Sequence, residues 1–174
     1  MSAVSNNGGT TAQSLISPDA VAIDNNGYLW VADNYDNDRL LCYKNPQSIM
    51  PSADYVLGQS NFTTQGYGVT QNELHISAIS SIAFDSKNNL WVYDVDNYRV
   101  LGFASADIYT NGANASWVMF QPNFTTAASA TLAQGYTINY DMAGFSYQVA
   151  IPNGNIVSAL PNPYQIDYGG YPEP

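Results

Sequence analysis

The sequence predicts an all-β protein in which a unit of four antiparallel strands occurs more than once. Three observations support this prediction: a long passage is written twice, apolar and polar residues alternate within it with a period of two, and Asn- and Gly-rich turns separate the alternating segments. The two copies occupy residues 17–64 and 78–126. Because the period is long and its content is strand-like, each copy is expected to be one small sheet that buries its faces against its neighbours.

Equivalent residues of the two copies keep a nearly constant spacing. The clearest correspondences lie 61, 61, 61 and 60 residues apart: Asp24 with Asp85, Trp30 with Trp91, Asp33 with Asp94, and Arg39 with Arg99. The segment VLGQSNFTT at 56–64 precedes VMFQPNFTT at 118–126 by 62 residues. Slips of one or two residues are expected in the loops between strands, which tolerate insertions.

Within the first copy, alternation predicts strands at residues 20–24 and 28–33. The turn between them is Asn25, Asn26 and Gly27, residue types that supply the positive φ of a hairpin turn. A third strand is predicted at residues 39–43 and a fourth at 53–58. The second copy predicts the same series, and its strands are listed here in order: 81–85, 90–94, 98–103 and 116–120.

Four strands that meander in this way form the blade of a β-propeller. The passages AVAIDNNGYLWVADNYDNDRLLCY and SIAFDSKNNLWVYDVDNYRVLGF also resemble NHL repeats, in which a strand ends in Asp, a Gly/Asn turn follows, the next strand ends in Val-x-Asp, and an Asn-x-Arg turn leads into the third. The resemblance covers about 50 of the 174 residues. It implies an NHL-like β-propeller with radially arranged blades, of which this chain holds a part.

The rest of the chain is less regular. Residues 1–16 are a polar N-terminal segment, and residues 65–77 lead into the second blade, whose unit therefore spans 65–126. A degenerate third blade can be aligned over 127–160, where VAIPNGNIVSAL follows the pattern of the first copy without its Asp residues, and YTINY before it suggests an extra strand. Residues 161–174 are rich in Pro, Gly and Tyr and are expected to form an extended tail or contact arm.

Two blades and a degenerate third are too few for a closed propeller, which usually has 4 to 8. An open stack leaves apolar faces in water at a cost of about 25 cal/mol per Å². Several copies could form one ring, the chain could belong to a longer propeller, or its ends could pack on other partners. Each of these alternatives makes the blade-end surfaces protein interfaces.

The composition excludes some classes of partner. Charged residues are 10% of the chain, and 14 acidic against 4 basic side chains give a net charge of −10. Nucleic acid is excluded as a partner, because binding phosphates needs clustered Lys and Arg. No apolar run is long enough for a membrane-spanning helix. A charge-poor, Tyr- and amide-rich surface favours an extracellular or cell-surface protein.

Three Asn-x-Ser/Thr sequons fit the same location: Asn61, Asn114 and Asn123. Asn61 and Asn123 belong to the NFT segment of each copy. Glycosylation and a structural use of NFT are both open. The N-terminus shows neither the charged region nor the apolar region of a signal peptide.

The nearly constant spacing between equivalent residues of the two copies favours structural roles for them. Trp30 and Trp91 are expected to pack between blades, and each repeated Asp–Arg pair is expected to brace a turn or to link two blades. The Asp- and Asn-rich segment 33–38 does not match the spacing of an EF-hand loop, so a solvated turn is expected there rather than a Ca²⁺ site. Cys42 stands alone among apolar neighbours and is expected to be a buried, inert thiol.

No catalytic, cofactor or metal constellation is predicted. The single histidine, His75, excludes a multi-histidine metal site, and neither a GxSxG elbow nor a Gly-rich phosphate loop occurs. The sequence therefore favours a noncatalytic, extracellular or surface propeller that binds a protein partner or further copies of itself. The alternatives are a carbohydrate-binding propeller, in which Trp117 would contact the sugar, and part of an NHL-type metal-dependent lyase or hydrolase.

Overall fold

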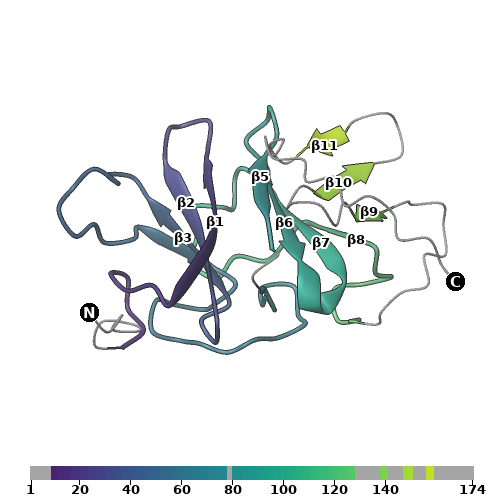
Figure 1. Ribbon diagram of the computed structural model, residues 1–174, viewed down its shortest axis with the longest axis horizontal. Coiled ribbons are helices and arrows are strands. Elements are labelled where there is room, and N and C mark those ends of the chain that lie inside the picture. The colour runs from purple at the N-terminus through teal and green to yellow at the C-terminus, as the bar shows by residue number, and fades with distance from the viewer. Residues whose placement is uncertain (1–8, 78–79, 128–137, 141–146, 151–155, 159–174) are drawn as a thin grey trace, which may run out of the picture. The chain divides into compact units, whose positions relative to one another are not determined.

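The computed structural model describes residues 9–77, 80–127, 138–140, 147–150 and 156–158 (Figure 1). These residues form two four-stranded antiparallel sheets, a three-stranded antiparallel sheet and one turn of 3₁₀ helix. The prediction of an all-β chain with four antiparallel strands in each copy is confirmed. The chain divides into two compact units, Met1–Thr131, which holds both four-stranded sheets, and Leu132–Pro174. No helix in the described part of the chain has the length and apolar character needed to cross a membrane.

The first sheet is a meander in which each strand pairs with the next. Its strands are β1 (Ser17–Ile23), β2 (Leu29–Asn34), β3 (Arg39–Tyr43) and β4 (Tyr55–Leu57), and the sheet order is β1-β2-β3-β4. Gly27 adopts φ 82° in the β1–β2 turn, a conformation that favours glycine.

The second sheet repeats this meander. Its strands are β5 (Ile82–Phe84), β6 (Leu90–Asp94), β7 (Arg99–Phe103) and β8 (Trp117–Met119), in the order β5-β6-β7-β8. The short 3₁₀ helix η2 (Val95–Asn97) joins β6 to β7 and ends at Tyr98, which is left-handed at φ 53°. Register is preserved as well, because Asp33 pairs with Arg39 and Asp94 with Arg99 at the same end of each sheet.

Each sheet begins with a hairpin that an aspartate holds together. Asp24 Oδ1 accepts the N–H groups of Asn26 and Tyr28, both at 2.9 Å, and Asp24 Oδ2 accepts the indole N–H of Trp30 at 3.1 Å. Asp85 does the same in the second sheet, with indole donation from Trp91 at 3.3 Å. Asp is favoured here because its short carboxylate reaches backbone N–H groups two residues on.

One apolar core lies between the two four-stranded sheets. We call the face of the first sheet that carries Ala22 and Trp30 its trailing face, and the face of the second sheet that carries Ile82, Phe84 and Leu90 its leading face. The buried residues of this shared core come from both faces and from the segments beside them: Trp30, Ala32, Leu40, Cys42, Leu57, Leu74, Ile76, Ile82, Leu90, Val92, Leu101, Phe103, Ile108 and Ala115.

The opposite face of the first sheet is its leading face. Because side chains alternate along a strand, Val21, Ile23 and Val31 lie on this face while Ala22 and Trp30 lie on the other. A second, smaller core covers part of it, formed by Val31, Leu41, Tyr43, Ala53 and Val56 with Ala12, Leu15, Leu29 and Phe62 packed around them. By the same alternation, Trp91 lies on the trailing face of the second sheet.

The second unit contains β9 (Ile138–Tyr140), β10 (Tyr147–Ala150) and β11 (Ile156–Ser158), in the sheet order β11-β10-β9. In the alignment of a degenerate third copy, β10 corresponds to β1 and β5. Those two strands lie at the edge of their sheets, whereas β10 lies in the middle. Residues 1–8, most of 127–160 and the predicted tail at 161–174 lie outside the described residues.

Candidate interaction surface

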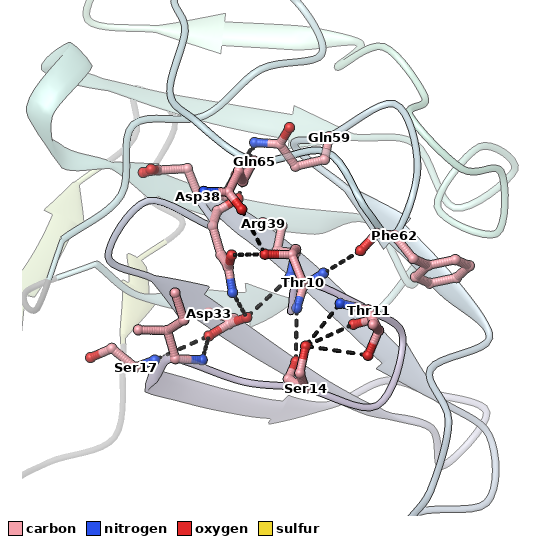
Figure 2. Close-up of polar contacts among 12 residues, drawn as sticks. Thr10, Thr11, Ser14, Ser17, Asp33, Asp38, Arg39, Gln59, Phe62 and Gln65 are labelled. Carbon is pink, nitrogen blue, oxygen red and sulfur yellow. Dashed lines mark hydrogen bonds and ion pairs between the residues drawn. The ribbon is translucent and has the colours of Figure 1, made fainter. Parts of the chain in front are cut away.

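The repeated Asp and Arg residues form a buried ion pair within each sheet. Arg39 Nε donates to Asp33 Oδ2 at 3.0 Å, and neither side chain is exposed to solvent (Figure 2). The two other guanidinium nitrogens donate to the carbonyl of Ser14 at 2.7 Å and to that of Phe62 at 2.8 Å. The guanidinium thus ties the chain entering the sheet and the chain leaving it to the β2–β3 turn, using the fork of donors that only Arg provides.

The second sheet repeats this arrangement with small changes. Arg99 Nε donates to Asp94 Oδ2 at 2.6 Å, again with neither side chain exposed. Its terminal nitrogens donate to the carbonyl of Phe124 at 2.5 Å and to those of Thr70 and Glu73 at 2.9 Å each. Each ion pair lies within its own sheet. It therefore braces the turn and the connectors of that sheet and does not link the two sheets. Burial raises the pKa of Asp94 against the opposing hydrogen bonds from Asn97, His75 and Arg99.

Two further residue types belong to these clusters. Asn37 and Asn97 donate to the same carboxylates, at 2.7 Å to Asp33 and 2.9 Å to Asp94. The side-chain amides of Gln59 and Gln121 donate at 3.0 Å to backbone carbonyls of the β2–β3 and β6–β7 turns. The repeat comparison contains these four residues, at spacings of 60 and 62, but it predicted no role for their side-chain amides.

The expectation of a solvated turn at residues 33–38 is wrong. Four of the acidic and amide residues in this segment are buried: Asp33, Asn34, Asn37 and Asp38. They are buried because the connectors fold over the turn. Asp33 binds Arg39 and Asn37, and Asp38 accepts a backbone N–H, so these carboxylates find partners other than water. Asn34 Oδ1 is buried with no hydrogen-bond partner in the described part of the chain. No group of three or more His, Cys, Asp or Glu side chains suited to a metal ion occurs in the described ranges.

Asp38 joins the first sheet to the segment that leads into the second. Its Oδ1 accepts the backbone N–H of Ile76 at 2.8 Å. Burial raises the pKa of Asp38 to about 6, although this hydrogen bond and the proximity of His75 favour the charged form. His75 is half-exposed, stacks on Tyr67 with 4.1 Å between ring centroids, and lies 3.8 Å from Asp96.

Tyr109, in the loop between β7 and β8, makes the closest polar link between the two sheets. Its hydroxyl donates to Asp24 at 2.8 Å and accepts from Asn26 at 2.6 Å and from Asn88 at 3.0 Å. Its ring packs on Trp30, with centroids 6.4 Å apart. Burial, followed by the hydrogen bond to Asp24, raises the pKa of Tyr109 to about 12.

The same loop covers the outer edge of the first sheet. Asn111 accepts the backbone N–H of Val56 at 3.0 Å, and the N–H of Gly112 donates to the carbonyl of Val56 at 2.9 Å. Val56 lies in β4, the last strand of its sheet. An edge strand has unsatisfied backbone groups, so this loop supplies partners that the sheet itself lacks.

An aromatic pair lies on the trailing face of the second sheet. Trp91 and Trp117 stack with 5.6 Å between centroids and an interplanar angle of 21°, and Trp117 is 43% exposed. Gly102 lies beneath them, where a Cβ would stand 2.7 Å from Trp91. The equivalent residues of the first sheet are Trp30 and Tyr55, which pack against Phe84 and Tyr109 of the second.

The other residues singled out from the sequence stand apart from these contacts. Asn61, Asn114 and Asn123 are all exposed. Asn61 Oδ1 accepts the N–H groups of Thr63 and Thr64 at 2.9 and 3.1 Å, so the NFT segment forms its own turn. Cys42 is fully buried, and burial raises the pKa of its thiol to about 12, which disfavours the reactive thiolate.

The chain was compared with known families and proteins. No protein-family model matches it, and no curated protein matches it either.

Proposed function

We propose that this chain is a noncatalytic, NHL-like partial β-propeller that acts through protein contacts at its blade-end surfaces and associates with further copies of itself. Each four-stranded sheet is then one blade. The observation that carries the proposal is the contact between the two sheets, in which a trailing face rich in aromatic residues meets an apolar leading face. Such a contact can be continued by another blade at either end.

Both ends of the pair of sheets carry exposed apolar side chains. Val21 and Ile23 are 66% and 58% exposed at one end, and Trp117 is 43% exposed at the other. Tyr and Trp are enriched at protein interfaces because they bury a large apolar area and keep a polar group. Large exposed apolar groups gathered on one face mark interaction sites.

An extracellular or cell-surface location forms part of the proposal. It is supported by the low content of charged residues and by the exposure of the three sequons at Asn61, Asn114 and Asn123. Expression in a eukaryotic secretory system tests it. A loss of mass on deglycosylation supports use of the sequons, and Asn61→Gln with Asn123→Gln identifies the sites.

Self-association is tested by measuring the native mass by light scattering across a dilution series. One chain has a mass of 18.9 kDa. We expect a mass above this value that falls on dilution, because blade-end contacts obey mass action. A single chain at every concentration, with a cooperative unfolding transition, would contradict the proposal.

A carbohydrate-binding propeller is the second candidate, favoured by the stacked and half-exposed Trp91–Trp117 pair. Aromatic faces stack on the apolar faces of sugar rings. Binding on a glycan array that Trp117→Ala removes would support this candidate. The third alternative, part of a metal-dependent lyase or hydrolase, would be favoured by stoichiometric Ca²⁺ or Zn²⁺ in the purified chain.

A further inference from the structure

The two outer faces of the pair of sheets correspond to the two faces that meet inside it. On the leading face of the first sheet, Val21 and Ile23 are 66% and 58% exposed. The residues 61 positions later are Ile82 and Phe84. Ile82 is 8% exposed and Phe84 packs on Trp30 with centroids 5.9 Å apart, because both face the first sheet. Val21 and Ile23 therefore occupy the positions that Ile82 and Phe84 use to contact the first sheet. Among the described residues, no sheet covers Val21 and Ile23 in the same way.

The trailing face of the second sheet corresponds in the same way to the face that the first sheet buries. Trp30 is fully buried, whereas its counterpart Trp91 is only partly buried. Tyr55 packs on Tyr109 with centroids 5.4 Å apart, whereas its counterpart Trp117 is 43% exposed. Trp91 and Trp117 thus form an aromatic platform at the place where the first sheet receives Phe84 and Tyr109.

The loops show the same correspondence. The loop 104–115 covers the first sheet through Tyr109 and pairs with the edge of β4 through Asn111 and Gly112. Its counterpart in the first copy is the loop 44–53, because Asp54 and Ser116 each donate to the strand before them, to Cys42 and Gly102, at 2.7 Å. Within the loop 44–53, Ile49 is 97% exposed and Met50 is 66% exposed.

We infer that a second copy of this chain seats the leading face of its first sheet, at Val21 and Ile23, on the Trp91–Trp117 platform of the second sheet, and that its loop 44–53 covers the edge of β8. The contact is head-to-tail and reproduces between chains the contact that the two sheets already make. This inference rests on the proposed function, since it names the partner and the two surfaces for self-association. A head-to-tail contact closes into a ring or extends into a filament according to its rotation.

The chemistry of both faces suits this partner. None of Val21, Ile23, Trp91 and Trp117 is ionised, so these side chains can meet without bringing together like charges of a chain whose net charge is −10. Val118 pairs with Leu101 in the second sheet as Val56 pairs with Leu41 in the first. The backbone groups of Val118 therefore hold the position in β8 that the backbone groups of Val56, the partners of the loop 104–115, hold in β4.

Mixing two variants of the full chain tests the inference. Val21→Lys alters only the leading face, and Trp117→Lys alters only the trailing face. We expect each variant alone to remain a single chain by light scattering, because every possible pair lacks one intact face. An equal mixture should form a dimer and nothing larger, because one intact leading face can meet one intact trailing face.

The other outcomes overturn the inference in distinguishable ways. If one variant still associates alone, the contact joins two like faces. If both variants associate as the wild type does, self-association uses another surface, so the proposed function stands while this inference fails. If the wild type is a single chain at every concentration, both fail, and a loss of stability in Trp117→Lys would then indicate that the chain covers its own platform.

Controls keep the experiment interpretable. Tyr35→Asp changes a side chain that is 72% exposed in the β2–β3 turn and should leave association unchanged. Each variant is used after its urea unfolding transition has been measured. Val21 is mostly exposed in the edge strand β1, so Val21→Lys is expected to fold, and its loss of association tests the leading face even if Trp117→Lys does not fold.

Discussion

Tyr109 donates its hydroxyl hydrogen bond to Asp24 over 2.8 Å, across 85 residues of sequence and from the second sheet to the first. Asp24 is also the residue that holds the β1–β2 hairpin and the indole of Trp30. The same carboxylate therefore accepts hydrogen bonds from the local turn and from the other sheet. A substitution of Tyr109 or Asp24 should destabilise both sheets.

Tyr109→Phe tests this coupling. The variant keeps the ring packing on Trp30 but removes one donated and two accepted hydrogen bonds. We expect a loss of about 1–3 kcal/mol in the free energy of unfolding, because the partners are left partly unsatisfied. Urea unfolding measures it. Tyr67→Phe is the matched control, since Tyr67 is 67% exposed, and an equal effect in both variants would contradict the assigned role.

Arg39→Lys is expected to destabilise the chain strongly. Lysine cannot reproduce the three directions in which Arg39 donates, to Asp33, Ser14 and Phe62, and one or more buried groups would lose their partner. Breaking a buried ion pair costs about 3–5 kcal/mol. Thermal unfolding measures the effect, which should recur in Arg99→Lys.

The control for charge alone is Lys87→Ala, at an exposed position in the β5–β6 turn. It removes one positive charge without touching either cluster and should shift the unfolding temperature little. If Arg39→Lys were as stable as Lys87→Ala, the guanidinium would not be holding the connectors in place.

Asp38 should make stability depend on pH in an unusual direction for a carboxylate. Its pKa is raised to about 6 in the folded chain, above the ordinary value of 3.8, so the folded state binds the proton more tightly than the unfolded state. This contribution to stability is complete below pH 3.8 and is lost as the pH rises through about 6. With partial solvent screening, the loss is expected to be about 1–2 kcal/mol.

Asp38→Asn isolates this contribution. Asparagine can still accept the N–H of Ile76 and tolerates the left-handed backbone of this position, φ 43°, but it carries no charge. Urea unfolding between pH 4 and 7 should show that the variant loses less stability than the wild type as the pH rises. Parallel curves for the two proteins would show that Asp38 titrates alike in the folded and unfolded chains.

Gly102→Ala should disturb the Trp91–Trp117 stack. A Cβ at this position would stand 2.7 Å from Trp91 and 2.8 Å from Trp117, closer than carbon atoms can approach, so the rings must move. Overpacking of this kind costs about 1–3 kcal/mol. Near-ultraviolet circular dichroism reports on stacked indoles directly, and an unchanged spectrum would contradict the observed geometry.

The sequence predicts the strands well because alternation and turn residues are local signals. The β1–β2 hairpin follows from Asn25, Asn26 and Gly27, and its counterpart β5–β6 follows from the repeat. The pairing of Asp33 with Arg39 was also visible, because the same two residue types recur as Asp94 and Arg99. A residue that acts within its own copy is written twice and can be found by comparing the copies.

Residues that contact the other copy need not recur in both copies, so comparing the copies does not find them. Tyr109 binds Asp24, but the loop 44–53 has no tyrosine, so comparison of the two copies does not single it out. The burial of Asp38 was missed for a related reason, because the segment that covers it leads into the second copy and places the N–H of Ile76 over its carboxylate. Composition alone makes an Asp- and Asn-rich turn look hydrated.

The pairing of Val56 with Asn111 and Gly112 bears on how the chain folds as it is synthesised. The outer strand of the first sheet gains these partners after the ribosome has added residue 112, and Arg39 gains the carbonyl of Phe62 only a few residues after β4 itself. A nascent chain that ends after Phe62 but before residue 112 has its buried ion pair, but the outer backbone groups of β4 have no hydrogen-bond partner. Vectorial synthesis therefore leaves a window in which chaperones or neighbouring nascent chains can bind that edge, and rapid translation of the second copy closes it.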